Sequence, residues 1–316
     1  MTEKNRSDNP IVVSISCITY NHAPFIRQCL DGFMMQQTDF AFEVLIHDDA
    51  STDGTTEIIK EYEAKYPDVF KPIYEEENQW VKGRRGSAVF NFPRAKGKYI
   101  ALCEGDDYWT DPLKLQKQVD FLNAHNNFTM CFTNAIQHYE DGHQEDTKFA
   151  EILDREYSGV ELFVNWIVPT ATLVVRSEVV RSNLYIKATQ NPYFIFGDIL
   201  VILAAATHGK VWGFSNPTCV YRRLSTGALA TTDRTYSGKL AYIRHVIEIQ
   251  RFFGDEYNCE SMVLYQYYAL MRRAWAENEI CKLLRFVCSS LRYSFVGTLR
   301  LYMKKMIMHL KRYRLN

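Results

Sequence analysis

Three carboxylates stand together in Glu104-Gly105-Asp106-Asp107, directly after the apolar run from Tyr99 to Cys103. The run predicts a strand, and the acids predict the turn that follows it. Carboxylates this close repel one another unless water or a hard cation neutralises them. Mg²⁺ or Mn²⁺ with a phosphate oxygen is the natural choice. The alternative is an acidic turn that only caps the helix expected after Pro112, because Asp and Gly are common turn residues.

A second acidic strand end lies earlier in the chain, where the apolar run 42–46 leads to Asp48 and Asp49 and then to a helical pattern over 56–65. The first apolar run, 11–18, ends in Thr19-Tyr20-Asn21-His22 and leads to a helix that Pro24 can open. Three such strand-to-helix units predict a parallel sheet, and ligands of these sheets bind at the carboxyl ends of the strands. We therefore expect the acidic turns to face one cleft.

Four segments in this order resemble glycosyltransferase family 2, the inverting nucleotide-sugar enzymes with the GT-A fold. They are 16–21 (Ser-Cys-Ile-Thr-Tyr-Asn), 48–55 (Asp-Asp-Ala-Ser-Thr-Asp-Gly-Thr), 95–100 (Ala-Lys-Gly-Lys-Tyr-Ile) and 104–107. The resemblance covers roughly residues 11–125 and weakens afterwards. Two departures stand out: Cys17 replaces the family's usual Pro, and Glu104 occupies a position where the metal-binding motif commonly begins with Asp.

The resemblance implies an α/β GT-A fold, a mainly parallel sheet flanked by helices. It also implies a donor site that binds a UDP-sugar with Mn²⁺ or Mg²⁺. Asp106 would be the main metal ligand, with Glu104 near the ribose or the water shell of the metal. The other donor-binding positions that it implies, or leaves as candidates, are Thr19, Tyr20, Asn21, Asp48, Asp49, Arg94 and Asp107.

For uracil, Thr19 and Tyr20 would lie against the ring, and Asp48 or Asp49 would accept a hydrogen bond from its N3–H. Core packing is the alternative for Tyr20, and capping of the following helix is the alternative for the two aspartates. For Arg94, the family's usual Ala-Arg-Asn motif is not visible upstream, so the identity of the donor-binding arginine stays open.

Inverting transfer also needs a base that removes a proton from the acceptor hydroxyl. The resemblance places an Asp or Glu of a later segment in this role. Asp198 is the candidate, because it is the only acid between Glu178 and Asp233 and begins the apolar helical run 199–206. Its alternative role is that of N-cap for this helix.

A basic segment, 221–228 (Tyr-Arg-Arg-Leu-Ser-Thr-Gly-Ala), follows the strands expected at 210–214 and 218–221. Similar transferases carry a loop here that closes over the donor diphosphate, so Arg222 or Arg223 is expected to bind phosphate. A solvated basic loop is the alternative. The basic stretch 82–86 is a second candidate for contact with the donor or an anionic acceptor.

The 37 basic and 37 acidic residues balance, which argues against general nucleic-acid binding. The charge is unevenly distributed, because from Ile280 onward the chain has nine basic residues and no acidic one: Lys282, Arg285, Arg292, Arg300, Lys304, Lys305, Lys311, Arg312 and Arg314. Apolar residues recur there at helical spacing at Leu299, Tyr302, Met303, Met306, Leu310 and Tyr313. Such a helix suits the surface of an anionic inner membrane, whereas the alternative is packing on the catalytic domain or in a homodimer.

No apolar run reaches the roughly 20 residues that span a bilayer, and the polar start does not resemble a signal peptide. We therefore expect a cytoplasmic protein, peripheral on the membrane if the basic helix binds there. The eight cysteines show no zinc spacing and are expected to be reduced and mostly buried. The predicted domains are a GT-A domain over 1–236, with a nucleotide-binding half at 11–110 and an acceptor half at 111–236, and a helical extension over 237–316. Within the extension, Tyr265, Tyr268 and Trp275 are predicted as core residues.

The sequence thus predicts an inverting, metal-dependent hexosyltransferase. It would move a hexose or N-acetylhexosamine from a UDP-sugar to a hydroxyl of a lipid-linked glycan. The process would be the synthesis of a bacterial surface polysaccharide. One alternative is a sugar-phosphate nucleotidyltransferase, but the Gly-rich loop typical of that class is missing after the first strand. The other is a protein that binds a nucleotide or glycan without catalysis. The acids at 104, 106, 107 and 198 argue against it.

Overall fold

The computed structural model describes residues 10–84, 86–224 and 235–313, with side chains as far as Lys305. The chain forms two compact units, one of residues up to 192 together with 196–224, and one of residues 193–195 together with those from 225 onward. Helix α9 (Tyr236–Phe253) belongs to the second unit, and the domain boundary that we placed after residue 236 stays a prediction.

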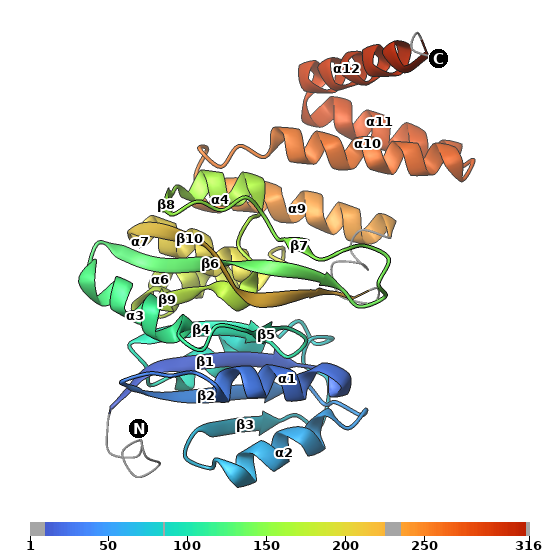
Figure 1. Ribbon diagram of the computed structural model, residues 1–316. Coiled ribbons are helices and arrows are strands. Elements are labelled where there is room, and N and C mark those ends of the chain that lie inside the picture. The colour runs from blue at the N-terminus through green and yellow to red at the C-terminus, as the bar shows by residue number, and fades with distance from the viewer. Residues whose placement is uncertain (1–9, 85, 225–234, 314–316) are drawn as a thin grey trace. The chain divides into compact units, whose positions relative to one another are not determined.

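Four parallel strands carry the sequence motifs. Their order in the sheet is β3 (Phe70–Tyr74), β2 (Ala41–Asp48), β1 (Ile11–Thr19) and β4 (Tyr99–Glu104), and Figure 1 shows β1 and β2 side by side. β1, β2 and β4 are largely apolar because they are buried on both faces. The predicted parallel arrangement is confirmed for this half of the sheet.

The sheet continues as a mixed sheet, and in the described part of the chain it has ten strands, including β9 (Val174–Arg176), which lies antiparallel between β4 and β6 (Phe128–Tyr139). Strand β10 (Lys210–Arg223) runs parallel to β6, so the longest ladders of the sheet are parallel. The short strands β5 (Tyr108–Trp109), β7 (Thr147–Lys148) and β8 (Arg155–Tyr157) pair antiparallel with β10, β6 and β10, respectively.

Strand β10 corrects one prediction, because we expected two strands, at 210–214 and 218–221. The structure has one strand with irregular register between Phe214 and Pro217 and again between Pro217 and Cys219. Proline has no N–H to donate to a ladder, so it is accommodated at a bulge, and the strand resumes beyond it.

Helices α1 (Ala23–Met34) and α2 (Thr55–Lys65) follow β1 and β2, and α3 (Lys114–Ala124) follows β5. Pro24 lies in the first turn of α1, as predicted. Further helices of this unit are α4 (Gly159–Asn165), α5 (Ser177–Val180), α6 (Asn183–Gln190) and α7 (Gly197–His208), with short helical turns at Ser87–Asn91, Phe92–Arg94 and Thr170–Thr172.

The core lies between the sheet and these helices. Ile26, Leu30 and Phe33 recur at helical spacing on α1 and are fully buried in one cluster with Val13 and Ile15 of β1. Each such side chain contributes about 2 kcal/mol by leaving water, so the strand ends are fixed by a rigid base. The described thiols are free, as predicted, with Cys17, Cys29, Cys103, Cys131, Cys219 and Cys259 buried and Cys281 and Cys288 exposed.

The second unit contains α9, α10 (Glu260–Ala276), α11 (Ile280–Tyr293) and α12 (Phe295–Tyr313), and Figure 1 shows the last three as successive helices. No helix among the described residues has the length and apolar character needed to cross a membrane. The prediction that Tyr265 and Trp275 belong to the core is wrong, because they are 55% and 72% exposed. They lie off the buried face of α10, which carries Val263, Leu264, Leu270, Met271 and Ala274.

Candidate active site

The acidic turn and the first strand end lie at one edge of the sheet. In the parallel register, Ile18 of β1 pairs with Glu104 of β4, and Thr19 pairs with Asp48 of β2. Three of the predicted site segments therefore meet where parallel α/β sheets bind ligands. Because these strands are hydrogen-bonded along their length, the position of their ends does not depend on loop conformation.

Three buried polar atoms at this edge have no hydrogen-bond partner among the described residues: Thr19 Oγ1, His22 Nδ1 and Asp106 Oδ1. Gly105 lies among them, since a Cβ atom there would be 2.6 Å from Thr19 Oγ1 and 3.0 Å from His22 Nδ1. His22 Nε2 lies 3.9 Å from Asp106 Oδ2. An unpaired buried polar group costs about 1–3 kcal/mol, so this cluster has the character of a site that a ligand completes.

The carboxylates of the site interact with one another. Burial, together with the charges of Asp106 and Asp198, raises the pKa of Glu104 to about 8. Burial and the charge of Asp106 also raise the pKa of Asp107 well above its usual range, although its carboxylate accepts a hydrogen bond of 2.8 Å from the backbone N–H of Arg222. A cation would relieve this repulsion.

The protein groups alone do not complete a metal site, because no cluster of three His, Cys, Asp or Glu residues among those described is arranged to hold an ion. Mg²⁺ and Mn²⁺ need fewer protein ligands when a substrate supplies the others, and Mg²⁺ commonly uses one or two carboxylates plus phosphates and water. Glu104 and the unpaired Oδ1 of Asp106 fit such a shared site. The donor set therefore suits a cation that arrives with a diphosphate.

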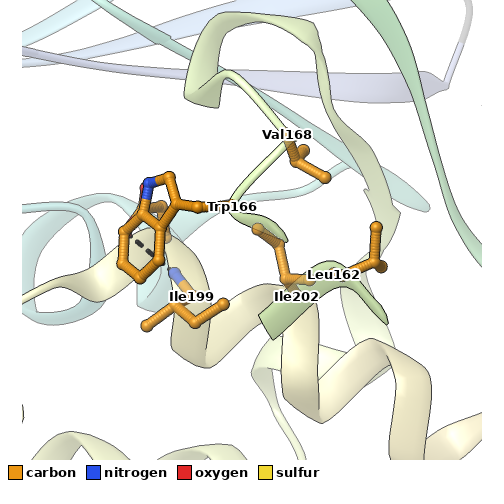
Figure 2. A pocket seen from close by; sticks show the side chains of 6 residues that line it. Leu162, Trp166, Val168, Ile199 and Ile202 are labelled. Atoms are coloured by element: carbon orange, nitrogen blue, oxygen red, sulfur yellow. Dashed lines mark hydrogen bonds between the residues drawn. The ribbon is translucent and has the colours of Figure 1, made fainter. Parts of the chain in front are cut away.

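Asp198 lies in the first turn of α7 and lines an apolar pocket with Leu162, Trp166, Val168, Ile199 and Ile202 (Figure 2). The N-cap of α7 is Phe196, so Asp198 does not have the N-cap role that we considered. Its carboxylate accepts hydrogen bonds from Ile199 N at 2.8 Å and from Thr170 Oγ1 at 3.4 Å. Burial raises its pKa, and these two hydrogen bonds partly offset the shift. The charge of Asp198 contributes to the raised pKa of Glu104, so the two carboxylates interact electrostatically.

At the end of β1, Tyr20 is 46% exposed, so its ring is available to a ligand and is not core packing. Asn21 adopts a left-handed conformation with φ 55° and connects two loops. Its backbone N–H donates to Ser51 Oγ at 2.9 Å, and its Oδ1 accepts from Thr52 N at 2.8 Å. Asn21 thus fixes the position of Tyr20.

Asp48 and Asp49 have protein partners of their own. Asp48 is 1% exposed and accepts hydrogen bonds from Ser51 N at 3.2 Å and Thr56 Oγ1 at 2.5 Å. Neither bond caps α2, because the N-cap of this helix is Gly54 and no side chain caps it. Asp49 accepts from Gln79 N at 2.5 Å and Trp80 N at 3.1 Å. The second aspartate therefore holds the loop after β3 and does not cap α2.

Arg94 lies apart from the unpaired cluster. Its guanidinium donates to the carbonyl oxygens of Lys71 at 2.6 Å and Ile46 at 3.0 Å, and to Asn91 Oδ1 at 2.8 Å. A guanidinium engaged in this way braces β2 and β3, so the structure favours a structural role over the donor contact that we considered.

Arg222 is also a brace, contrary to our expectation of a phosphate ligand. Its side chain is 5% exposed and forms an ion pair of 2.6 Å with Glu140 Oε1. It also donates to the carbonyl oxygen of Asp106 and to Gln28 Oε1, and it lies 4.5 Å from the centre of the Tyr108 ring. These bonds fix the acidic turn.

Arg223 has fewer polar contacts. It is half-buried, donates to Gln137 Oε1 at 2.9 Å and lies against the rings of Phe149 and Tyr221. The remaining residues of the predicted closing loop, 225–228, and Arg85 of the basic stretch 82–86 lie outside the described residues.

Sequence reasoning missed four residues at or beside this site. We did not name His22 among the predicted site residues, although its position after a strand end was a signal for the site. Gln28 and Glu140 support Arg222, and Thr170 contacts the Asp198 carboxylate. These three gave no signal, because each meets its partner only through the fold.

Comparison with known proteins identifies similar chains. The model of the family described as Glycosyl transferase family 2 matches residues 14–180. An uncharacterised protein of Mycobacterium tuberculosis is 40% identical over 225 residues, which are 70% of this chain and 62% of that protein. This chain thus spans less than two thirds of that relative's length. The Escherichia coli protein WfaP, named a UDP-Glc:alpha-D-GlcNAc-diphosphoundecaprenol beta-1,3-glucosyltransferase, is 32% identical over 117 residues, 37% of this chain and 43% of WfaP.

Two solved structures share the fold. S. aureus TarS (residues 1–349) in complex with UDP-GlcNAc has a TM-score of 0.60 at 16% identity and covers 89% of this chain and 81% of its own. The mannosyltransferase PcManGT from Pyrobaculum calidifontis, in complex with GDP-Man and Mn²⁺, has a TM-score of 0.57 at 18% identity, with coverages of 98% and 84%. The predicted GT-A fold is confirmed.

Proposed function

Because this chain belongs to glycosyl transferase family 2, we propose that it transfers a sugar from a UDP-sugar to a hydroxyl of a glycan, with inversion at the anomeric carbon, in polysaccharide synthesis. One observation carries the proposal. Thr19 Oγ1, His22 Nδ1 and Asp106 Oδ1 are buried and unpaired among the described residues, and they lie at the edge of the sheet where β1, β2 and β4 end. A donor diphosphate and its cation would give these atoms partners.

On the donor side, Asp106 and Glu104 would hold Mn²⁺ or Mg²⁺, which would neutralise the diphosphate as it leaves. The hydroxyl of Thr19 and the ring of His22, whose Oγ1 and Nδ1 are buried and unpaired among the described residues, would donate to donor oxygens beside this pair. Tyr20, which is 46% exposed at the end of β1, offers an aromatic face to the base. We prefer UDP because of two similar proteins: TarS was solved with UDP-GlcNAc, and the name of WfaP contains UDP-Glc. PcManGT, in contrast, was solved with GDP-Man.

On the acceptor side, Asp198 would act as the base. Its carboxylate would take the proton of the acceptor hydroxyl while that oxygen bonds to the anomeric carbon and the bond from this carbon to the diphosphate oxygen breaks. A raised pKa makes the carboxylate a stronger base than an ordinary aspartate. The apolar wall formed by Leu162, Trp166 and Val168 limits water around it.

For the acceptor, we propose a lipid-linked glycan. The name of WfaP gives its acceptor as a sugar diphosphoundecaprenol, and the similarity to WfaP extends over 117 residues.

A nucleotide panel tests the donor side. We expect calorimetry and thermal shift to show binding of UDP that needs Mn²⁺ or Mg²⁺, exceeds that of GDP, CDP and dTDP, and is lost in Asp106→Ala. Asp198→Asn should retain UDP binding and lose turnover of UDP-sugars with lipid-linked acceptors. Binding of GDP in place of UDP would refute the choice of base. If the wild-type protein bound no nucleotide, the transferase assignment would be refuted.

A further inference from the structure

Helices α11 and α12 expose large apolar side chains that a protein in water normally buries. The exposed fractions are 64% for Ile280 and 59% for Leu284 on α11, and 61% for Phe295, 55% for Val296, 45% for Leu299 and 53% for Met303 on α12. Single exposed apolar residues are ordinary, but a cluster of this kind on two successive helices marks an interaction surface. We call these six side chains the apolar face of the extension.

The apolar face is continuous along each helix. On α12, Val296, Leu299 and Met303 follow the spacing of one helical face, whereas Thr298, on another face, is buried and hydrogen-bonds to Ser290 of α11. On α11, Ile280 and Leu284 are one turn apart, and the buried residues Phe286 and Ser290 lie on another face. The apolar residues are therefore turned away from the contact between the two helices.

Basic side chains accompany the apolar face. Arg285, Arg292, Arg300 and Lys304 are exposed and have no carboxylate partner among the described residues. Lys282 pairs with Glu279, at 2.7 Å, and no acidic residue follows Glu279 in the sequence. The surface thus combines exposed apolar residues with uncompensated positive charge.

We propose that α11 and α12 bind the surface of a membrane that contains anionic lipids. Such a surface offers hydrocarbon to the apolar face and phosphate to the basic residues at the same time. A second copy of this chain would bring two positive surfaces together, and a neutral protein partner would leave four unpaired cations at its rim. The inference goes beyond the transfer reaction, because it concerns where the protein is held and needs no turnover.

The charge contribution sets the expected size of the effect. Each Lys or Arg near an anionic surface contributes on the order of 1 kcal/mol, or about five-fold in binding. Reversing two such charges should therefore weaken binding at least about twenty-five-fold, the product of two five-fold losses. Binding should also weaken as salt rises, since the Debye length falls from about 10 Å at 0.1 M to about 3 Å at 1 M.

The test is flotation of the full chain with vesicles of phosphatidylcholine alone or with 30 mol% phosphatidylglycerol, a fraction that we choose for the assay. We expect the wild type to float only with the anionic vesicles. The double variant Arg300→Glu, Lys304→Glu should stay in solution, and so should Leu299→Ser, Met303→Ser. The matched control is Lys96→Glu, Lys187→Glu, which reverses two exposed lysines of the first unit and should float as the wild type does.

Several outcomes would overturn the proposal. The wild type failing to float with anionic vesicles would do so, as would equal flotation with phosphatidylcholine alone or an equal loss in the lysine control. Light scattering provides a further check. If the wild type is a dimer that Leu299→Ser, Met303→Ser converts to a monomer, a second copy occupies the face. Thermal melts of each variant show whether it is folded, and UDP binding, measured separately, would fail only if the proposed function is wrong.

Discussion

Replacing Arg222 by methionine is expected to destabilise the protein by about 3 kcal/mol in the absence of any nucleotide. The guanidinium is 5% exposed and donates to Glu140 Oε1, the carbonyl oxygen of Asp106 and Gln28 Oε1. Methionine replaces the unbranched stem of the arginine side chain but leaves all three acceptors without their donor. Breaking one side of a buried ion pair costs about 3–5 kcal/mol. We take the lower end of this range because the Glu140 side chain is 34% exposed and water can reach it.

Urea unfolding of wild type, Arg222→Met and Arg223→Met measures the difference, provided that the slope with denaturant is unchanged. Arg223 is the matched control, because it is the next residue on the same strand and its polar bond among the described residues is to Gln137 Oε1. Its replacement should cost about 1 kcal/mol or less. Equal losses for the two variants, or a loss below about 1 kcal/mol for Arg222→Met, would refute the bracing role. A phosphate ligand would show the opposite pattern, with stability kept and UDP affinity lost.

Two further predictions concern Asp198, the proposed base, and the unpaired polar atoms around Gly105. Thr170→Val removes a hydrogen bond that lowers the pKa of Asp198, so this pKa should rise further and the acidic limb of the kcat/KM profile should move to higher pH. An unmoved limb would exclude Asp198 as the base whose ionisation limits the rate. Gly105→Ala places a methyl group 2.6 Å from Thr19 Oγ1 and 3.0 Å from His22 Nδ1, and calorimetry should show UDP binding weakened by about tenfold or more. UDP binding at wild-type strength in this variant would place the donor elsewhere.

The first half of the fold could be predicted from the sequence because its strands are long and buried on both faces. The runs 11–18, 42–46 and 99–103 match β1, β2 and β4, and the side-chain period of α1 matches its buried face. Strand β9 could not be predicted, since its three residues are too few to show a period. Its position between β4 and β6 is determined by tertiary packing and not by its local sequence.

The sequence indicates candidate residues for the site but not the role of each. The family pattern indicates the acids at 104, 106 and 107, and Asp198 follows from the scarcity of acids after Glu178. Burial and hydrogen bonds decide what each residue does, and these depend on distant partners. Arg222, for example, binds Gln28, which is 194 residues away along the chain.

Charge alone therefore does not distinguish ligand-binding residues from structural residues. The presence of a buried polar atom without a hydrogen-bond partner does. A buried charged or polar group is stable when its bonds are satisfied, so groups with full sets of partners belong to the framework. By this criterion Arg94, Arg222 and Asp49 are framework residues, although their charge suggested ligands. The same criterion distinguishes the adjacent acids Asp106 and Asp107. Asp107 accepts the Arg222 N–H, while Asp106 keeps a buried oxygen without a partner among the described residues, so Asp106 is the acid that the proposed cation would contact.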